Sequence, residues 1–231
     1  MMIGIIGAME LEIALLKEAI SNCKETKIGK FTFYEGILEG KAVVVLLSGI
    51  GKVSAAVGTT LLIERYHPKL IVNTGTAGGL ADTLVHDIIL ATEVCYHDVD
   101  VTAFGYKIGQ QAQMPPAFKA DELYSGVIKE VAEKHRYTMH YGQVVSGDSF
   151  ISDPNRLQQI ANTFPDAKAV EMEAAAIAQT CYLLSVPFVM LRAISDKAGE
   201  GNAISYNEFV EEAGRISARI VKDFCGLSNT F

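Results

Sequence analysis

The sequence predicts an α/β fold built on a mixed β-sheet, and two patterns in the chain point to it. Short runs rich in Val and Ile alternate with longer stretches of helical composition, which is the element order of α/β proteins. Several of the short runs are apolar at every position, as expected of strands that helices cover on both faces. The chain has 231 residues and no internal repeat or Pro/Gly/Ser-rich linker, so we expect one domain over residues 1–231.

The expected elements follow from these patterns in chain order. Strands are predicted for residues 3–6, 31–37, 42–47, 70–73, 88–94, 140–145 and 188–194. Helices are predicted for residues 12–19, 53–66, 121–134, 154–162, 170–184 and 207–224. Two helix starts are marked chemically. Asp153 is a capping residue before Pro154 at the first helical position, and Ser205 precedes Glu208 with capping-box spacing.

Composition and charge exclude several classes of protein. A hydrophobic content of 49% excludes intrinsic disorder, and a net charge of −7 provides no basic field for binding nucleic acid. No apolar run reaches the ~18–20 residues that a membrane span needs. Residues 1–8 lack the cationic segment of a signal peptide, so we expect a cytoplasmic protein. The four cysteines are widely spaced, which predicts reduced thiols instead of disulfides or a zinc site.

Glycine-rich turns narrow the choice of ligand. Residues 4–9 lack the G-x-G-x-x-G spacing of dinucleotide sites. Residues 49–53 lack the first glycine of a Walker loop and the Ser or Thr after Lys52, so no nucleotide cofactor is expected. Residues 73–79 end an apolar strand, and open α/β sheets bind ligands at the carboxyl ends of strands. We therefore expect backbone N–H groups there, and the Thr76 hydroxyl, to face a ligand.

Carboxylates in apolar surroundings are the candidates for chemistry. Asp196 follows the last predicted strand, where reactive groups of doubly wound folds lie, and is the first candidate for a general acid. Glu171 and Glu173 stand among apolar neighbours, so at least one must be paired or hydrogen-bonded. On a helix the two diverge by about 200°, so one is expected to cap the helix start and the other to serve a ligand hydroxyl. Glu10 and Glu12 offer a third carboxylate, and spacing does not choose between them.

The remaining segments suggest an interface and no metal. A polar, proline-bearing loop over residues 102–119 is long for a compact domain, and we interpret it as an interface element. His97 and Asp98 alternate along an extended segment and have no second ligand cluster, so no metal site is expected. The G-x-S-x-G motif of serine hydrolases is missing, and covalent catalysis is not expected.

Seven collinear segments together resemble the bacterial 5'-methylthioadenosine/S-adenosylhomocysteine nucleosidases of the nucleoside phosphorylase superfamily. These segments cover residues 3–10, 48–53, 73–78, 102–106, 145–151, 170–174 and 192–196. The resemblance implies a three-layer α/β/α sandwich on a twisted mixed sheet, and a homodimer. It implies hydrolysis of the N-glycosidic bond of methylthioadenosine and S-adenosylhomocysteine, and also of 5'-deoxyadenosine. Adenine and 5-methylthioribose or S-ribosylhomocysteine would be released, in methionine salvage and removal of methyl-cycle by-products, without a cofactor.

The resemblance also implies residue roles. Glu12 would activate the attacking water, Glu173 would hold the ribose 2'- and 3'-hydroxyls, and Asp196 would protonate adenine N7. The adenine would meet Phe150 and Ile151, with Ser195 orienting the acid. The other expected binding residues are Met9, Ile50, Thr76, Ala77, Gly78, Glu171, Met172 and Tyr206, with Phe104 contributed by the loop of the second subunit.

Four positions depart from the family pattern, and two other functions stay open. Leu11, Thr76, His86 and Tyr206 stand where an acidic residue, Ser, Gly and Phe are common, and the Tyr206 hydroxyl leaves the preference among the three nucleosides open.

A purine nucleoside phosphorylase would need a cationic phosphate pocket and no carboxylate at position 12. A non-catalytic adenine nucleoside sensor would not need three carboxylates. Cleavage itself needs a group that protonates the purine and an anion near the ribose, where positive charge develops.

Overall fold

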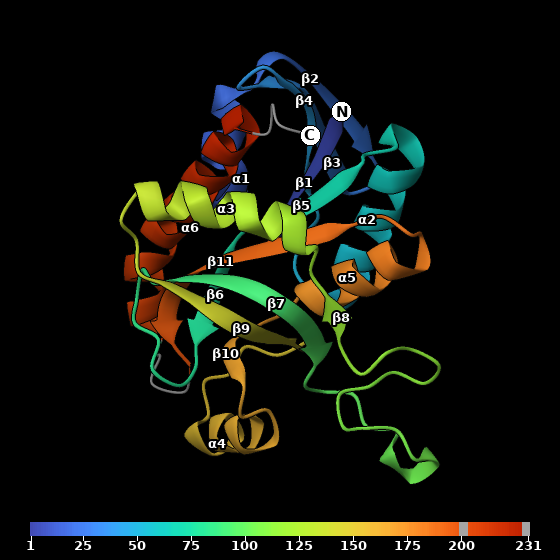
Figure 1. The fold of residues 1–231 in the computed structure, drawn as a ribbon, viewed down its shortest axis with the longest axis vertical. Coiled ribbons are helices and arrows are strands. Elements are labelled where there is room, and N and C mark those ends of the chain that lie inside the picture. Colours follow the sequence, from blue (N-terminus) through green and yellow to red (C-terminus); the bar gives the residue numbers. More distant parts are fainter. Residues whose placement is uncertain (199–202, 228–231) are drawn as a thin grey trace.

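A mixed sheet of eleven strands forms the centre of the molecule in the computed structural model, which describes residues 1–198 and 203–227 (Figure 1). Its order is β2-β3-β4-β1-β5-β11-β6-β10-β9-β7-β8. The strands span β1 (Met2–Gly7), β2 (Ser21–Ile28), β3 (Phe31–Leu38), β4 (Lys41–Leu47), β5 (Leu70–Asn73), β6 (Thr76–Gly79), β7 (Ile88–Tyr96), β8 (Phe118–Lys119), β9 (Met139–Ser146), β10 (Ala167–Glu171) and β11 (Phe188–Lys197).

Helices cover both faces of this sheet, which confirms the predicted three-layer α/β/α class. One layer contains α1 (Glu10–Ala19), α3 (Glu122–Lys134) and α6 (Ala203–Leu227), and the other contains α2 (Lys52–Tyr66) and α5 (Ala174–Leu183) (Figure 1). Val43 and Val45 of β4 pack in the first apolar core, whereas Val44 and Leu46 pack in the second. A strand buried on both faces has no polar side, and this explains why its sequence shows no alternation.

One end of the sheet closes on itself. β11 pairs with β5, β6 and β7, and the pairs β6–β10, β10–β9 and β9–β7 complete a ring of five strands. α4 (Pro154–Thr163) lies next to this ring, and its Asp153 accepts the N–H of Asn155 as the predicted cap. The ring places β6, β10 and the carboxyl-terminal half of β11 around one space.

Four strands were not expected from the sequence. β2 is exposed and polar along most of its length, β6 has the sequence TAGG, and β8 has two residues. The fourth, β10, includes Val170 and Glu171, which we had placed in a helix. α5 begins at Ala174, and the apolar alanines after it conceal this boundary because Ala-rich sequence is helical by composition.

Other element boundaries differ by a few residues. β11 continues through Ser195 and Asp196 to Lys197 instead of ending at residue 194. α6 begins at Ala203, so Ser205 lies inside the helix and does not precede it. Within the described ranges, no helix has both the length and the apolar character that crossing a membrane requires.

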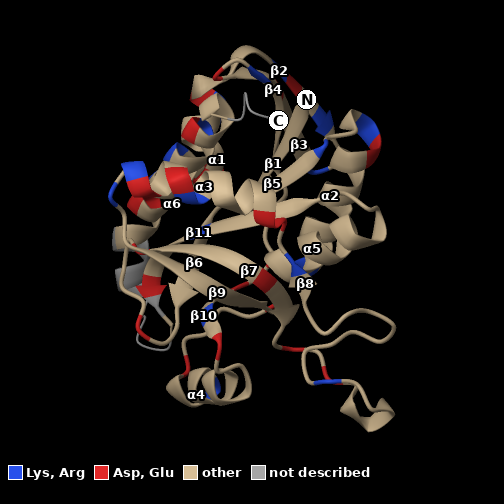
Figure 2. Cartoon of the chain, in the orientation of Figure 1, with Lys and Arg blue, Asp and Glu red and all other residues tan. Residues whose placement is uncertain are grey.

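The predicted interface loop projects from the body of the molecule between β7 and β8 (Figure 1). It contains a single turn of 3-10 helix, η1 (Thr102–Phe104), and the Phe104 side chain is 81% exposed. Lys and Arg are interspersed with Asp and Glu over the outer helices in the view of Figure 2. Three of the four cysteines are buried, and burial raises the pKa of Cys95, Cys181 and Cys225 to about 12, so these thiols are unreactive.

Candidate active site

A pocket lies where the closed ring of strands meets the amino-terminal ends of α1 and α5. It brings together thirteen of the fifteen residues expected from the sequence, namely Met9, Glu12, Ile50, Thr76, Ala77, Gly78, Phe150, Ile151, Glu171, Met172, Glu173, Ser195 and Asp196. Ala8, Ser149, Val170 and Ala198 complete the lining. The two remaining residues are Phe104, which is outside the pocket of its own chain, and Tyr206, whose side chain is outside the described residues.

The pocket is narrow and its opening is formed by two loops. About 90 Å³ of it is free, whereas sites for small molecules typically hold about 300–1,000 Å³. The loops cover residues 48–51 and 147–151, and we call them the mouth loops. Each places one largely exposed apolar side chain at the pocket, Ile50 at 56% and Phe150 at 49% exposure. A ligand as large as a nucleoside therefore has to move these loops or side chains when it enters.

Glu12 lies buried in the first turn of α1, and all its acceptor positions are used. Its Oε2 accepts the N–H groups of Ala8 at 2.8 Å and Met9 at 3.0 Å. Its Oε1 accepts the N–H of Thr76 at 2.9 Å and the Thr76 hydroxyl at 3.1 Å. Four donors hold the carboxylate in one orientation at the bottom of the pocket. The Thr76 N–H and hydroxyl, which we expect to face a ligand, both bind Glu12 in this structure, and Thr76 also lines the pocket.

Burial and position distinguish Glu12 from Glu10. Glu12 is 4% exposed and lines the pocket, whereas Glu10 is at the surface and pairs with Lys17 two helical turns further along α1. Gly75 explains how Glu12 can approach the β5–β6 connection so closely. A Cβ atom at Gly75 would lie 2.6 Å from Glu12 Oε1, so only a residue without a side chain fits beside the carboxylate.

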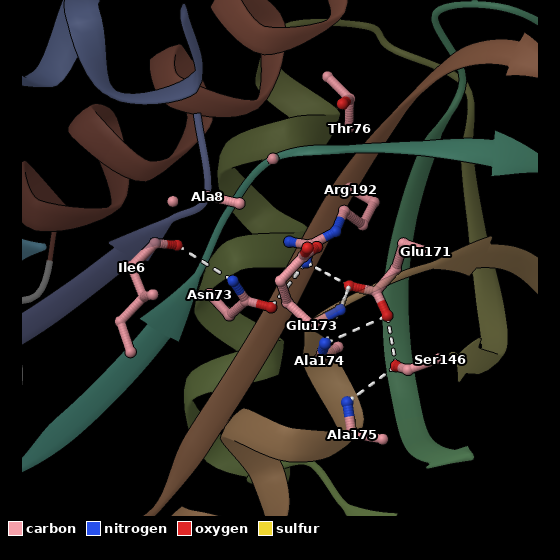
Figure 3. Close-up of polar contacts among 12 residues, drawn as sticks. Ile6, Ala8, Asn73, Thr76, Ser146, Glu171, Glu173, Ala174, Ala175 and Arg192 are labelled. Atoms are coloured by element: carbon pink, nitrogen blue, oxygen red, sulfur yellow. Dashed lines mark hydrogen bonds and ion pairs between the residues drawn. The ribbon is translucent and has the colours of Figure 1, made fainter. Parts of the chain in front are cut away.

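Glu171 is a structural anion at the start of α5. Its carboxylate accepts the N–H groups of Glu173 at 3.0 Å and Ala174 at 2.9 Å, and it also binds the Ser146 hydroxyl (Figure 3). The Arg192 guanidinium donates to it at 2.7 Å from β11. One glutamate of the pair thus caps the helix start, as predicted. The two glutamates are not positions of one helix, however, so the predicted divergence of about 200° is wrong. Glu171 ends a strand, and Glu173 precedes the first helical residue.

Glu173 has its carboxylate in the pocket with one backbone donor. Its Oε1 accepts the N–H of Gly51 from the first mouth loop at 2.8 Å. Burial, together with the nearby charge of Glu171, raises the pKa of Glu173 to about 8, and the Gly51 hydrogen bond opposes that rise. The free protein therefore holds a proton on this carboxyl to higher pH than an exposed glutamate would, and a ligand that donates hydrogen bonds to the carboxylate would favour its ionised form.

Asp196 stands beside Ser195 near the end of β11, and a β-bulge places both in the pocket. The register of β11 against β6 shifts between Ile194 and Asp196. Neighbouring residues of a regular strand point to opposite faces, and the extra residue of a bulge re-aims them. Ser195 donates its hydroxyl to Asp196 Oδ1 at 2.7 Å. Burial raises the pKa of Asp196, and the Ser195 hydrogen bond lowers it by less.

The pocket is acidic and without a cationic side chain among its described lining. Four carboxyl groups line it, those of Glu12, Glu171, Glu173 and Asp196, and none of the described lining residues is Lys or Arg. Arg192 is not a lining residue, and its guanidinium is bound to Glu171 and to Asn73 Oδ1 at 2.8 Å (Figure 3). In the described part of the chain, no group of three or more His, Cys, Asp or Glu side chains is arranged to hold a metal ion.

Sequence reasoning missed the partners that hold Glu171. Arg192 is 2% exposed within an otherwise apolar strand. Because a buried guanidinium needs a carboxylate partner, an arginine at this position of the sequence is a signal that such a partner exists. Asn73 links Arg192 to the Ile6 carbonyl at 3.0 Å. Ser146 accepts the N–H of Ala175 at 2.8 Å while it donates to Glu171. A lone Ser at a strand end gives no sequence signal of that kind.

His86 illustrates a departure from the family pattern. Its backbone has φ +72°, a conformation that favours glycine, and its N–H donates to the Ile194 carbonyl at 2.8 Å. Its ring meets Phe209 of α6 edge-on, with ring centroids 5.8 Å apart. The larger side chain therefore adds an aromatic contact to α6 at the cost of a strained backbone.

Comparisons with known proteins agree with this geometry. Residues 2–225 match the family model described as the Phosphorylase superfamily. A 5'-methylthioadenosine/S-adenosylhomocysteine nucleosidase of Staphylococcus haemolyticus is 50% identical over 222 residues, 96% of this chain and 97% of that protein. The crystal structure of the Neisseria meningitidis enzyme of the same name, in complex with methylthio-immucillin-A, has a TM-score of 0.95 at 46% identity and covers 97% of this chain and 98% of that one. A nucleosidase from Colwellia psychrerythraea, in complex with adenine, has a TM-score of 0.95 at 42% identity, with 98% and 95% covered.

Proposed function

The chain belongs to the phosphorylase superfamily, among its 5'-methylthioadenosine/S-adenosylhomocysteine nucleosidases, and we propose that the acidic pocket between the mouth loops is where its reaction takes place. The protein is an N-glycosyl hydrolase that releases adenine from methylthioadenosine and S-adenosylhomocysteine. We assign the steps of this reaction to three carboxyl groups, those of Glu12, Glu173 and Asp196.

Asp196 acts on the leaving base. Cleavage of the N-glycosidic bond leaves electrons on the purine, and a proton delivered to N7 neutralises them as the bond breaks. A general acid must hold its proton near neutral pH, and burial raises the pKa of Asp196 in that direction. The Ser195 hydroxyl, 2.7 Å away, fixes which carboxyl oxygen faces the base. Phe150 and Ile151 line the same pocket as Asp196, and we assign them to contact with the adenine ring.

Glu12 acts on the sugar side. As the base departs, positive charge spreads over the ribose ring, and a fixed carboxylate stabilises it. A water molecule bound by Glu12 would lose its proton to the carboxylate while its oxygen bonds to the anomeric carbon. Because four donors already hold Glu12, the Thr76 hydroxyl is the group that can turn away and free an acceptor position. The Ala8 and Met9 N–H groups keep the carboxylate in place meanwhile.

Glu173 holds the ribose. An ionised carboxylate accepts hydrogen bonds from two vicinal hydroxyls, which would replace part of the hydration that burial has removed. Glu171 cannot take this role, because Arg192, Ser146 and the start of α5 occupy its oxygens. Met9, Ile50 and Met172 supply apolar surface for the sugar and the thioalkyl group.

The observation that supports hydrolysis over phosphorolysis is the charge of the pocket. Four carboxyl groups and no Lys or Arg among the described lining residues would repel phosphate, whereas water needs only Glu12. The test is release of adenine from methylthioadenosine in phosphate-free buffer, followed by chromatography. Equal rates with and without phosphate are expected. A rate that requires phosphate would assign the chain to phosphorolysis, and tight binding without release would make it a sensor.

The interface loop supports a further proposal, that the protein works as a homodimer. Phe104 is 81% exposed and does not line the pocket of its own chain. The side chain belongs to a loop that is long for a compact domain, and such loops usually have a functional or interface role. We expect the loop of each subunit to reach the thioalkyl end of the pocket in the other, with Phe104 closing it.

A further inference from the structure

Three charged side chains outside the pocket lining tie the two mouth loops together. Lys52 donates through Nζ to Asp98 Oδ2 at 2.7 Å, and its backbone N–H donates to Asp148 Oδ1 at 2.8 Å. Asp98 Oδ2 also accepts the N–H of Asp148 at 3.0 Å. Asp98 lies just after β7, and its Oδ2 therefore binds both loops. It accepts from Lys52, which follows the first mouth loop, and from Asp148 within the second.

We propose that Lys52, Asp98 and Asp148 are positioning residues of the nucleosidase, which hold the mouth loops in the spacing that puts the Gly51 N–H on Glu173. The proposal rests on the function assigned above to Glu173. None of the three side chains lines the pocket, so they act through the loops and not on the substrate.

The mouth loops connect the three charged residues to the pocket through residues that are adjacent in sequence or in contact. Gly51, directly before Lys52, donates to Glu173 at 2.8 Å. It adopts φ +93°, and a Cβ atom there would lie 3.1 Å from Asp148 Oδ1, so the two loops touch at this glycine. Phe150, two residues after Asp148, belongs to the pocket lining. A shift of the Lys52–Asp98 contact would therefore move both the Gly51 hydrogen bond to Glu173 and the Phe150 side chain.

The cluster has the geometry of a fixed contact and not of a loose surface pair. The side chains of Lys52 and Asp98 are 24% and 21% exposed, and the Lys52 ammonium also lies 5.3 Å from the ring centre of Tyr96. Tyr96 is fixed in turn by its hydroxyl, which donates to Gln179 of α5 at 2.6 Å. Burial raises the pKa of Asp98, but the hydrogen bonds from Lys52 and Asp148 outweigh it and the pKa is lowered.

Loss of the Gly51 hydrogen bond has a distinct signature in pH. The charged groups that face Glu173 are Glu12 from α1, Glu171 from β10 and Arg192 from β11, and the hydrogen-bond donor to its carboxylate is the Gly51 N–H of the first mouth loop. Since that N–H lowers the pKa of Glu173, its withdrawal raises the pKa further. The acidic limb of kcat/KM against pH should then move to higher pH, which a loss of stability alone would not cause.

The test compares Lys52→Met and Asp98→Asn with the wild type, with Lys52→Arg as the conservative variant and Asp82→Asn as control. Lys52→Met removes the ammonium and keeps the backbone N–H that binds Asp148, and Asp98→Asn keeps an oxygen for the Asp148 N–H. Asp82 pairs with Lys168 at the surface, away from the mouth loops. Each protein is assayed for adenine release from pH 5 to 9, and its thermal unfolding is recorded.

We expect KM to rise about 10-fold in both variants, the effect of weakening a hydrogen bond to a charged group, with kcat changed by less than about 3-fold. The acidic limb should move to higher pH, Lys52→Arg should restore much of the loss, and the double variant should be no worse than either single one, because both break one contact. Unchanged KM and pH profile in folded variants, or a change in melting temperature alone, would overturn the proposal. A wild-type protein that releases no adenine would instead refute the function on which the proposal rests.

Discussion

At the scale of single residues, the pocket carries its chemistry at a cost in stability. Asp196 and Glu173 are buried carboxyl groups with few donors, and burial raises the pKa of both. Glu12, equally buried, has four donors. Glu12, which must stay ionised, therefore has its hydrogen-bond acceptors filled. Asp196, which gives up a proton, and Glu173, which awaits the ligand hydroxyls, have fewer donors.

Asp196→Asn should affect activity and stability in opposite directions. Asparagine cannot give a proton to the base, so adenine release should fall about 10²- to 10⁴-fold. The folded state disfavours ionised Asp196, and its neutral replacement should raise the melting temperature of the free protein at pH 7.5. Initial rates and calorimetry measure the two effects. An Asp196→Asn protein with wild-type turnover would exclude this residue as the acid.

Glu173 should make the stability of the free protein depend on pH. Its pKa in the folded state is about 8, above the unfolded value of 4.5, so the folded form binds the proton more tightly. The stabilisation is complete below pH 4.5 and is lost as pH rises through about 8. We expect Glu173→Gln to flatten this part of the stability curve and to raise KM. Urea unfolding at pH 5, 6.5 and 8 checks the first effect, and an unchanged slope would contradict it.

At the scale of elements, the Arg192–Glu171 pair joins β11 to β10 and to the start of α5. Arg192→Met leaves the Glu171 carboxylate buried without its cation and should lower the free energy of unfolding by about 3–5 kcal/mol. The double variant with Glu171→Gln should lose less. Arg215→Met breaks an exposed pair with Glu211 in α6 and is the control, with an expected loss of at most about 0.5 kcal/mol. Equal losses in Arg192→Met and Arg215→Met, measured by urea unfolding, would refute the argument.

Most elements could be predicted from sequence where the physical cause is local. β1, β4 and β5 are apolar on both faces, and Asp153-Pro154 marks the start of α4 by its chemistry. β6 and β10 could not be predicted, since the Ala and two Gly of TAGG disfavour a strand and Val170-Glu171 runs into alanines. Both strands exist because the five-stranded ring offers them hydrogen-bonding partners, which is a property of the tertiary structure.

The site was predictable to the same degree. Position after the last predicted strand singled out Asp196, and burial cost singled out the Glu171/Glu173 pair, but spacing did not choose between Glu10 and Glu12. The resemblance to known nucleosidases assigned Glu12, and its place in the pocket agrees. What sequence reasoning could not supply was the hydrogen-bond network through Asn73 and Ser146, because its partners lie far apart along the chain.

At the scale of the whole molecule, the projecting loop predicts that two subunits share their sites. Sedimentation should give a mass of about 50 kDa, twice the 25.0 kDa of the chain. Phe104→Ala should raise KM, whereas Leu84→Ala, which removes another exposed apolar side chain, should not. A fully active monomer would contradict the dimer.

Co-expression sharpens this test. In a mixed dimer of Phe104→Ala and Asp196→Asn chains, the Phe104→Ala subunit keeps Asp196 and receives Phe104 from its neighbour. That site should regain the wild-type KM, although each variant alone is defective. No recovery in the purified mixed dimer would mean that Phe104 does not act across the interface.

The acidic lining also bears on inhibition. A compound whose ring nitrogen is protonated would place a permanent positive charge where the natural nucleoside acquires one only fleetingly, and the carboxylates of Glu12 and Glu173 would hold it. Inhibitors of this pocket should therefore be designed from sugar mimics that contain an amine, and should not carry phosphonates or other anionic groups.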